Sequence, residues 1–206
     1  MKKNISISNL LIGHREFRKK FAVEQAAFSK LATEGQKPQA LWIGCSDSRV
    51  IPEHITNAKA GELFVVRNIA NVVPPAGLVP SVGTAIEYAV LHLHVPHIII
   101  CGHTECGGIK ALEQPVDVIR EPHLARWVEL IRPALIKVKT ARVSEEERDL
   151  ETIKANVLIQ MDNLQTYKCV REAISAGKLM THGWLYDLHK GQLFAYNNHS
   201  KTWRVL

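Results

Sequence analysis

Apolar and charged residues alternate at helical spacing over residues 8–33. This spacing predicts an amphipathic helix that ends before Gly35 and Pro38. Short continuous apolar runs come next, and such runs are typical of buried strands. They cover residues 40–45, 63–66 and 97–101. Helical periodicity appears between and after them, over residues 81–93 and 106–112.

The second half of the chain begins with two helical stretches. Pro133 lies inside the first stretch, residues 122–141, and predicts a kink or break there. A Ser-x-x-Glu capping box at Ser144 opens the second stretch. We expect a single long helix over residues 144–176 with Gly177 as its stop.

Two further strands are predicted near the C-terminus, at residues 179–187 and 192–196. Alternation of strands and helices, with continuously apolar strands, indicates an α/β fold around a mostly parallel sheet flanked by helices. At 206 residues the chain is expected to form a single domain, residues 1–206. Ligand sites in such folds lie at the carboxyl ends of the strands.

Composition excludes several classes of protein. Hydrophobic residues make up 46% and charged residues 22%, which excludes a disordered chain. No apolar run is long enough to span a membrane. The net charge is +6, but the basic residues are scattered among acids, so we expect no nucleic-acid partner. The N-terminal residues 1–6 lead into no signal peptide, which predicts a reducing cytoplasm in which the four cysteines are thiols or metal ligands.

The ends of two predicted strands carry metal-binding side chains. Cys45 ends the first strand, and His103 and Cys106 follow the third. Two cysteines and one histidine leave one tetrahedral position of Zn²⁺ open, which is typical of a catalytic site. The other two cysteines, Cys101 and Cys169, are expected to be small buried residues.

Asp47 and Arg49 lie directly beside the first metal-binding cysteine. Residues two apart in an extended segment face the same side, so both side chains are expected near Cys45. Arginine and aspartate form bidentate pairs that keep the carboxylate ionised and fix its direction. Such a pair alone is more often structural, but beside a metal it favours a role in orienting the nucleophile.

These motifs resemble those of the β-class carbonic anhydrases. The resemblance rests on Cys-Ser-Asp-Ser-Arg at 45–49 and His-x-x-Cys-Gly-Gly at 103–108. Further blocks are similar to the family and bring the resemblance to residues 36–191. These blocks are residues 61–71, 85–90 and 182–187.

The resemblance implies one zinc ion per subunit, bound by Cys45, His103 and Cys106, with Asp47 and Arg49 as the catalytic dyad. It implies the reversible hydration of CO₂ to bicarbonate and a proton, through attack by zinc-bound hydroxide. The residue that passes the proton to buffer is not identified, and His54 is considered only because it lies near the dyad in sequence.

Further expectations follow from the same resemblance. Gln36, Phe64 and Tyr88 match the substrate pocket of the family. Residues 1–35 would form a helical arm that packs on a partner subunit, and the chain would assemble as a homodimer or homotetramer.

Some members of the family carry a regulatory bicarbonate site, and Trp42, Arg67 and Tyr186 stand at matching positions. In those members the aspartate, here Asp47, closes the site as a fourth zinc ligand. The stretch 72–75 is more similar to members without this switch, so water and Asp47 both remain as candidates for the resting ligand.

Three other functions compete with this interpretation. The same scaffold can act on CS₂ or COS, and the sequence does not separate these substrates from CO₂. A non-enzymatic zinc or redox-sensing protein would need neither Gln36 nor the dyad. A cysteine phosphatase needs five residues between its cysteine and arginine, whereas Cys45 and Arg49 have three between them.

Overall fold

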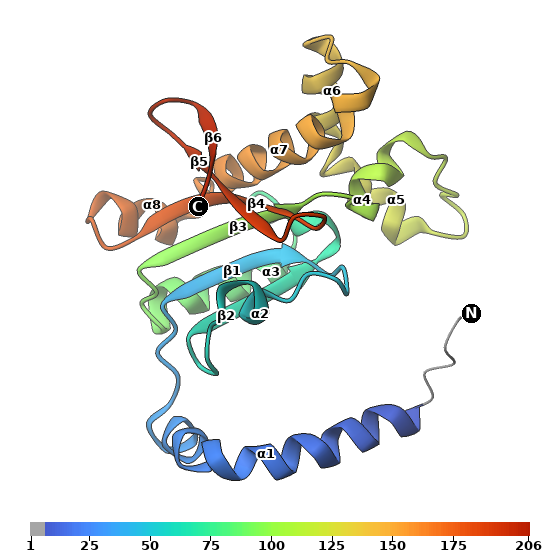
Figure 1. Ribbon diagram of the computed structural model, residues 1–206. Helices are drawn as coiled ribbons and strands as arrows, with labels where there is room; N and C mark the ends of the chain where they lie inside the picture. The colour runs from blue at the N-terminus through green and yellow to red at the C-terminus, as the bar shows by residue number, and fades with distance from the viewer. Residues whose placement is uncertain (1–6) are drawn as a thin grey trace. The chain divides into compact units, whose positions relative to one another are not determined.

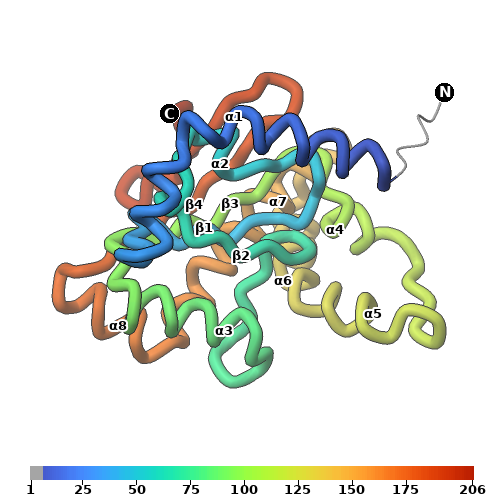
Figure 2. The backbone as a smooth tube through the Cα atoms, turned by 90° about the horizontal axis from the view of Figure 1, so that it is seen from below, coloured from blue at the N-terminus to red at the C-terminus, as the bar shows by residue number. Residues whose placement is uncertain are grey.

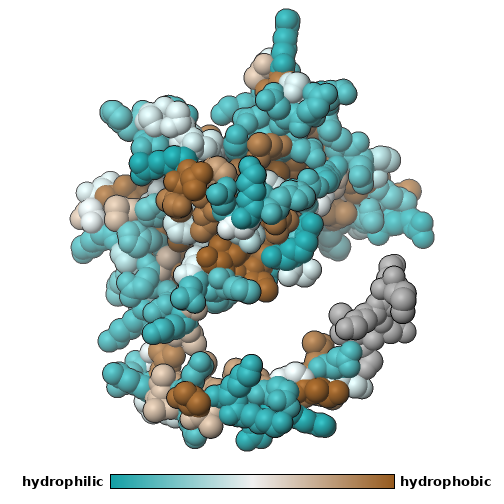
Figure 3. All heavy atoms as spheres, in the orientation of Figure 1, coloured by the Kyte–Doolittle hydropathy of each residue, from teal (hydrophilic) through white to brown (hydrophobic). Residues whose placement is uncertain are grey.

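The computed structural model describes residues 7–206. The chain divides into two compact units, with the boundary in the sequence between Gln36 and Lys37. The first unit is one helix, α1 (Ile7–Glu34), as the sequence predicts. Gly35, with a φ of 80°, ends it. No residue of α1 is buried, and Figure 3 shows apolar side chains on its surface. Residues 1–6, which suggested no signal peptide, lie outside the described part.

The second unit is built around a six-stranded sheet with the order β2-β1-β3-β4-β5-β6 (Figure 1). β2, β1, β3 and β4 run parallel, and β4, β5 and β6 pair in antiparallel fashion. The expectation of a mostly parallel sheet flanked by helices is therefore confirmed. The strands are β1 (Ala40–Cys45), β2 (Leu63–Asn68), β3 (His97–His103), β4 (Met180–Asp187), β5 (Gln192–Asn197) and β6 (Thr202–Val205).

Seven helices of the second unit connect and cover these strands. They are α2 (Pro52–Thr56), α3 (Pro80–Glu87), α4 (Gly107–Lys110), α5 (Pro122–Glu129), α6 (Arg132–Thr140), α7 (Glu145–Leu164) and α8 (Lys168–Ser175). One turn of π-helix (Tyr88–His92), called the π-turn below, extends α3. Short 3₁₀ helices cover Ile69–Asn71 and Ala111–Glu113. The break expected at Pro133 is confirmed, because this proline lies in the first turn of α6. The sequence did not predict α2 and β6.

The prediction of one helix over residues 144–176 is wrong. Ser144 caps α7 as expected, accepting a hydrogen bond from the backbone N–H of Glu147. The helix stops at Leu164, however, and Tyr167 is extended, with φ −81° and ψ 122°. Tyr167 is 4% exposed, and its hydroxyl donates to the carbonyl of Pro74 at 2.8 Å. A tertiary contact of this side chain therefore accompanies the break.

Helix α7 packs closely against β3 and β4. A Cβ at Gly102 would lie 2.8 Å from Val157, and one at Gly183 would lie 2.5 Å from the sulfur of Met161. These glycines let the helix backbone approach the sheet. Figure 2 shows α3 beside α8, where Tyr167 packs on Gly83.

The strands that position the functional residues form the centre of the sheet. Every residue of β1 is buried, and β3 is buried from Ile98 onward. Their parallel pairing brings their carboxyl ends to the same edge of the sheet. Within residues 7–206, no helix combines the length and apolar character needed to cross a membrane.

Candidate functional site

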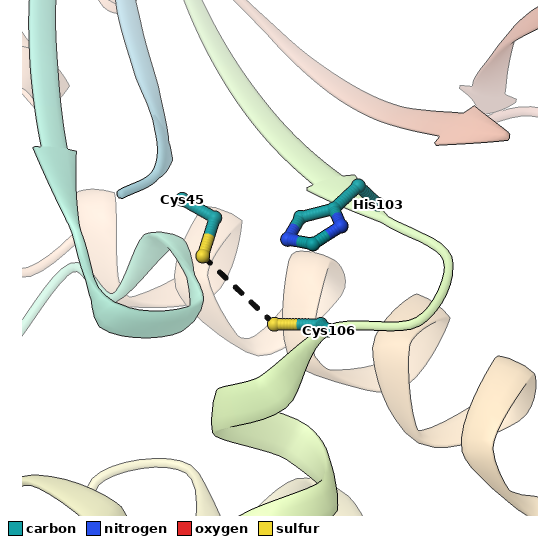
Figure 4. A group of neighbouring side chains, drawn as sticks. All are labelled: Cys45, His103 and Cys106. Carbon is teal, nitrogen blue, oxygen red and sulfur yellow. Dashed lines mark hydrogen bonds between the residues drawn. The ribbon is translucent and has the colours of Figure 1, made fainter. Parts of the chain in front are cut away.

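Three side chains that could hold a metal ion converge at the carboxyl edge of the sheet (Figure 4). Cys45 is the last residue of β1, His103 is the last residue of β3, and Cys106 immediately precedes α4. The two sulfurs and one ring nitrogen lie within 4.8 Å of one another. The structure thus brings together the three residues that the sequence selected.

The hydrogen bonding of His103 suits a metal ligand. The side chain is 1% exposed, and its Nδ1 atom lies 2.8 Å from the carbonyl oxygen of Thr104. This contact favours the tautomer in which Nδ1 carries the proton, which leaves a lone pair on Nε2. Nε2 has no hydrogen-bond partner among the described residues. A buried acceptor without a partner is costly, and a metal ion would satisfy it.

The two thiols influence each other's ionisation. Their sulfurs are 4.0 Å apart. Hydrogen bonding to Cys106 lowers the pKa of Cys45 to about 4. The hydrogen bond with Cys45, together with burial, raises the pKa of Cys106 above its usual value. One thiolate therefore forms readily and the second does not, unless a cation offsets the added charge. The donor set, which consists of Cys45, His103 and Cys106, fits a zinc ion.

Asp47 and Arg49 form a bidentate pair beside the donor set. Arg49 Nε donates to Asp47 Oδ1 at 2.9 Å, and Nη2 donates to Oδ2 at 2.7 Å. These hydrogen bonds hold the pKa of Asp47 well below its usual value. The segment is not extended as expected, because the chain turns at Ser48 and Arg49. The turn places the backbone N–H of Arg49 on Asp47 Oδ1, at 3.0 Å.

Phe64 and Tyr88, expected in a substrate pocket, lie close together. Their ring centroids are 5.9 Å apart. Phe64 is on β2, and Tyr88 begins the π-turn and is 45% exposed. Gln36 is exposed and belongs to the first unit. His54 is exposed on α2.

Trp42 and Arg67 lie on the neighbouring strands β1 and β2, and Tyr186 lies on β4, which β3 separates from β1. Trp42 is fully buried, and its Nε1 has no partner within the described chain. Tyr186 belongs to the same apolar cluster. Arg67 donates to the backbone carbonyl of Cys45 at 2.9 Å and to that of Asp47 at 2.6 Å. Its guanidinium therefore supports the segment that carries the dyad.

Sequence reasoning missed residues whose backbone supports the site. Glu105 has a φ of 59°, and its carbonyl accepts from Arg49 Nη2 at 3.0 Å. Ala70 has the same φ, and it packs in one apolar cluster with Cys45. Neither position is a glycine, so no residue type signalled the left-handed backbone. As expected, Cys101 and Cys169 are buried.

Comparison with known proteins decides the family. The family model for carbonic anhydrase matches residues 40–193. A carbonic anhydrase of Pseudomonas aeruginosa is 38% identical over 186 residues, covering 89% of this chain and 84% of the relative. The structure of the β-carbonic anhydrase CcaA superposes with a TM-score of 0.91 at 33% identity, covering 97% of this chain and 99% of that one.

The chain belongs to the β-class carbonic anhydrases. Tetrameric β-carbonic anhydrases from the fungus Sordaria macrospora are also similar, with a TM-score of 0.82 and 33% identity over 94% of this chain and 97% of theirs. The family is zinc-dependent and hydrates CO₂ reversibly to bicarbonate and a proton. The cluster of Cys45, His103 and Cys106 fits that cofactor.

Proposed function

We propose that Cys45, His103 and Cys106 hold the zinc ion of this carbonic anhydrase, one ion per chain. The unpartnered Nε2 atom of His103 carries the proposal, because it is buried in a donor set that contains two thiols. Two cysteines and one histidine leave a fourth position for water or substrate. Zinc in such a site supplies Lewis-acid chemistry that makes water nucleophilic near neutral pH.

Asp47 and Arg49 are proposed as the catalytic dyad. The Asp47 carboxylate accepts a hydrogen bond from the attacking water and thereby directs its lone pair toward CO₂. Arg49 keeps this carboxylate ionised and fixes its direction through the bidentate pair. In a closed state, Asp47 would leave Arg49 and serve as the fourth ligand, so the pair with Arg49 corresponds to the open state.

The substrate pocket is proposed to include Gln36, Phe64 and Tyr88. Phe64 and Tyr88 offer an apolar wall, which suits CO₂ because the molecule has no charge and no dipole. The contact between their rings supports this assignment. For Gln36 the proposal rests on the sequence resemblance alone.

Trp42, Arg67 and Tyr186 are proposed as a regulatory bicarbonate site. The unpartnered indole N–H of Trp42 supports an acceptor ligand there. Arg67 would have to release the carbonyls of Cys45 and Asp47 before it could bind an anion. Activity that rises steeply at alkaline pH, together with bicarbonate inhibition, would support the site. A flat profile from neutral to alkaline pH without inhibition would contradict it.

We further infer a single cytoplasmic catalytic domain that assembles as a homodimer or homotetramer, with residues 1–35 packing on a partner subunit. The absence of buried residues in α1 supports the arm, because its exposed apolar side chains can pack on a second copy. The tetrameric fungal relatives support the assembly. Four free cysteines agree with a reducing compartment.

Zinc analysis and stopped-flow CO₂ hydration of the wild type and Cys45→Ser test the central proposal. Wild type should contain one zinc ion per chain and hydrate CO₂, whereas Cys45→Ser should lose both properties. Cys101→Ala is the matched control, because this buried thiol lies outside the donor set. Full zinc content in Cys45→Ser would overturn the ligand assignment. A parallel assay with CS₂ tells whether the site accepts that substrate.

A further inference from the structure

One face of α7 carries buried polar side chains where a packed helix normally has apolar ones. Asn156 is 1% exposed and Gln160 is 0% exposed. Together with the half-buried Asn163 they are spaced at i, i+4 and i+7, so they lie on one stripe of the helix. Buried amide side chains such as these require specific hydrogen-bond partners.

These side chains bind one another and the backbone that follows β2. Asn156 Nδ2 donates to the carbonyl of Ala70 at 2.9 Å. Gln160 Nε2 donates to Asn156 Oδ1 at 2.8 Å, and its Oε1 accepts from the N–H of Val73 at 2.8 Å. Asn163 Nδ2 donates to the carbonyl of Val73, also at 2.8 Å. These three side chains, here called the amide ladder, therefore supply hydrogen bonds to residues 70–73, which lie outside the sheet.

That segment has an unfavourable backbone conformation. Ala70 and Asn71 have φ values of 59° and 49°, in the left-handed region that non-glycine residues rarely occupy. Ala70 is completely buried and Asn71 is 2% exposed. Such a conformation persists only where surrounding contacts determine it, and the bond from Asn156 to Ala70 is one of those contacts.

The same segment contacts the donor set. Ala70 packs in one apolar cluster with Cys45 and Cys106. A Cβ at Gly108, two residues after Cys106, would lie 3.0 Å from the Cβ of Ala70. The position of Ala70 thus affects both cysteines.

We propose that Asn156 and Gln160 are positioning residues of the metal centre, which hold the left-handed backbone at Ala70 so that this residue packs correctly against Cys45 and Cys106. The inference rests on the proposed ligand role of Cys45. Residues packed around a metal ligand orient it and adjust the properties of the metal. The ladder connects α7 to the metal without touching substrate.

The test compares Asn156→Leu and Gln160→Met with the control Thr152→Val. The first two changes approximate the original shape but remove the ladder bonds. Thr152 lies on the same helix, is 1% exposed, and its hydroxyl has no partner in the described chain. The measurements are the zinc dissociation constant by chelator competition, the thiolate-to-cobalt charge-transfer band of the cobalt(II)-substituted enzyme, and the unfolding midpoint.

We expect Asn156→Leu to weaken zinc binding by about 10–100-fold and to shift the cobalt band. Gln160→Met should act in the same direction with a smaller effect, because it acts through Asn156. Thr152→Val should leave zinc affinity and the band unchanged. A purely structural ladder would lower the unfolding midpoint alone, and that outcome overturns the proposal.

If Asn156→Leu does not fold, Gln160→Met decides by the same criteria. Unchanged zinc affinity and an unchanged band in a folded Gln160→Met would then overturn the proposal. Failure of the ligand assignment is separately visible, because it would appear as full zinc content in Cys45→Ser. If the wild type binds zinc and the Asn156 and Gln160 variants keep its zinc affinity and cobalt band, only the positioning role is contradicted.

Discussion

The Oδ2 atom of Asp47 lies 3.9 Å from the Nε2 atom of His103, so the carboxylate borders the donor set while it remains paired with Arg49. Asp47→Asn keeps the shape and removes the charge. We expect kcat/KM for CO₂ hydration to fall by about 10–100-fold, with zinc content unchanged. Stopped-flow kinetics and metal analysis check both.

Asp117→Asn is the control for this change. Asp117 Oδ1 accepts from the backbone N–H of Ile119 and of Arg120, and an asparagine oxygen can do the same. Its activity should equal that of the wild type. Wild-type activity in Asp47→Asn would remove Asp47 from the mechanism.

The Asp47–Arg49 pair predicts a pH dependence of stability. The pKa of Asp47 is lower in the folded protein than in the unfolded chain, where it is about 3.9. The pair therefore contributes its full stability above that unfolded value, and the contribution is lost as pH falls toward the folded pKa. The difference in unfolding free energy between wild type and Asp47→Asn should be constant from about pH 7 to about pH 5 and shrink below about pH 4.

Urea unfolding at several pH values measures this difference. A difference that stays constant below about pH 4 would show that Asp47 has an ordinary pKa, and a difference that grows as pH falls would show a raised pKa.

Two adjacent glycines at the start of α4 offer a matched pair of substitutions. A Cβ at Gly108 would lie 2.8 Å from Ile69 and 3.0 Å from the Cβ of Ala70, whereas a Cβ at Gly107 has nothing within 4 Å. Gly108→Ala should destabilise the fold by about 1–3 kcal/mol through overpacking and should weaken zinc retention. Gly107→Ala should be neutral or slightly stabilising, because alanine favours helix.

Thermal unfolding measures the stability of both variants, and chelator competition measures their zinc retention. Equal effects at the two positions would mean that close packing on Ala70 does not matter for the metal centre.

The cap of α7 can be tested independently of the metal. Ser144 Oγ accepts from the N–H of Glu147 at 3.4 Å. Ser144→Ala should lower the free energy of unfolding by about 1 kcal/mol. The exposed Ser175→Ala, at the last residue of α8, should change it by less than about 0.5 kcal/mol. Denaturant titration at pH 7 compares them, and equal values would contradict the capping role.

The parts of the fold predicted from sequence are those with a local cause. Continuous apolar runs predict the buried strands. Cysteine and histidine residues at the ends of two of these strands predict the donor set. Proline at position 133 gave the break before α6. Each of these signals lies within a few residues of the structure that it specifies.

The missed features depend on contacts between distant segments. The break after Leu164 involves Tyr167, whose hydroxyl binds Pro74, 93 residues earlier. The left-handed backbone at Ala70 and Glu105 has no glycine to mark it. Asn156 and Gln160 resemble ordinary helical polar residues until the fold buries them. Sequence periodicity does not contain such information.

The bond between Asn156 and Ala70 joins residues 86 positions apart. A ribosome that has just synthesised Cys106 has made all three residues of the donor set but not yet the helix that secures the backbone beside them. Because chains emerge from the N-terminus, Cys45, His103 and Cys106 leave the ribosome before the α7 residue that hydrogen-bonds to Ala70. The hydrogen bond from Asn156 to Ala70 can form only after the C-terminal half of α7 has been translated and has docked.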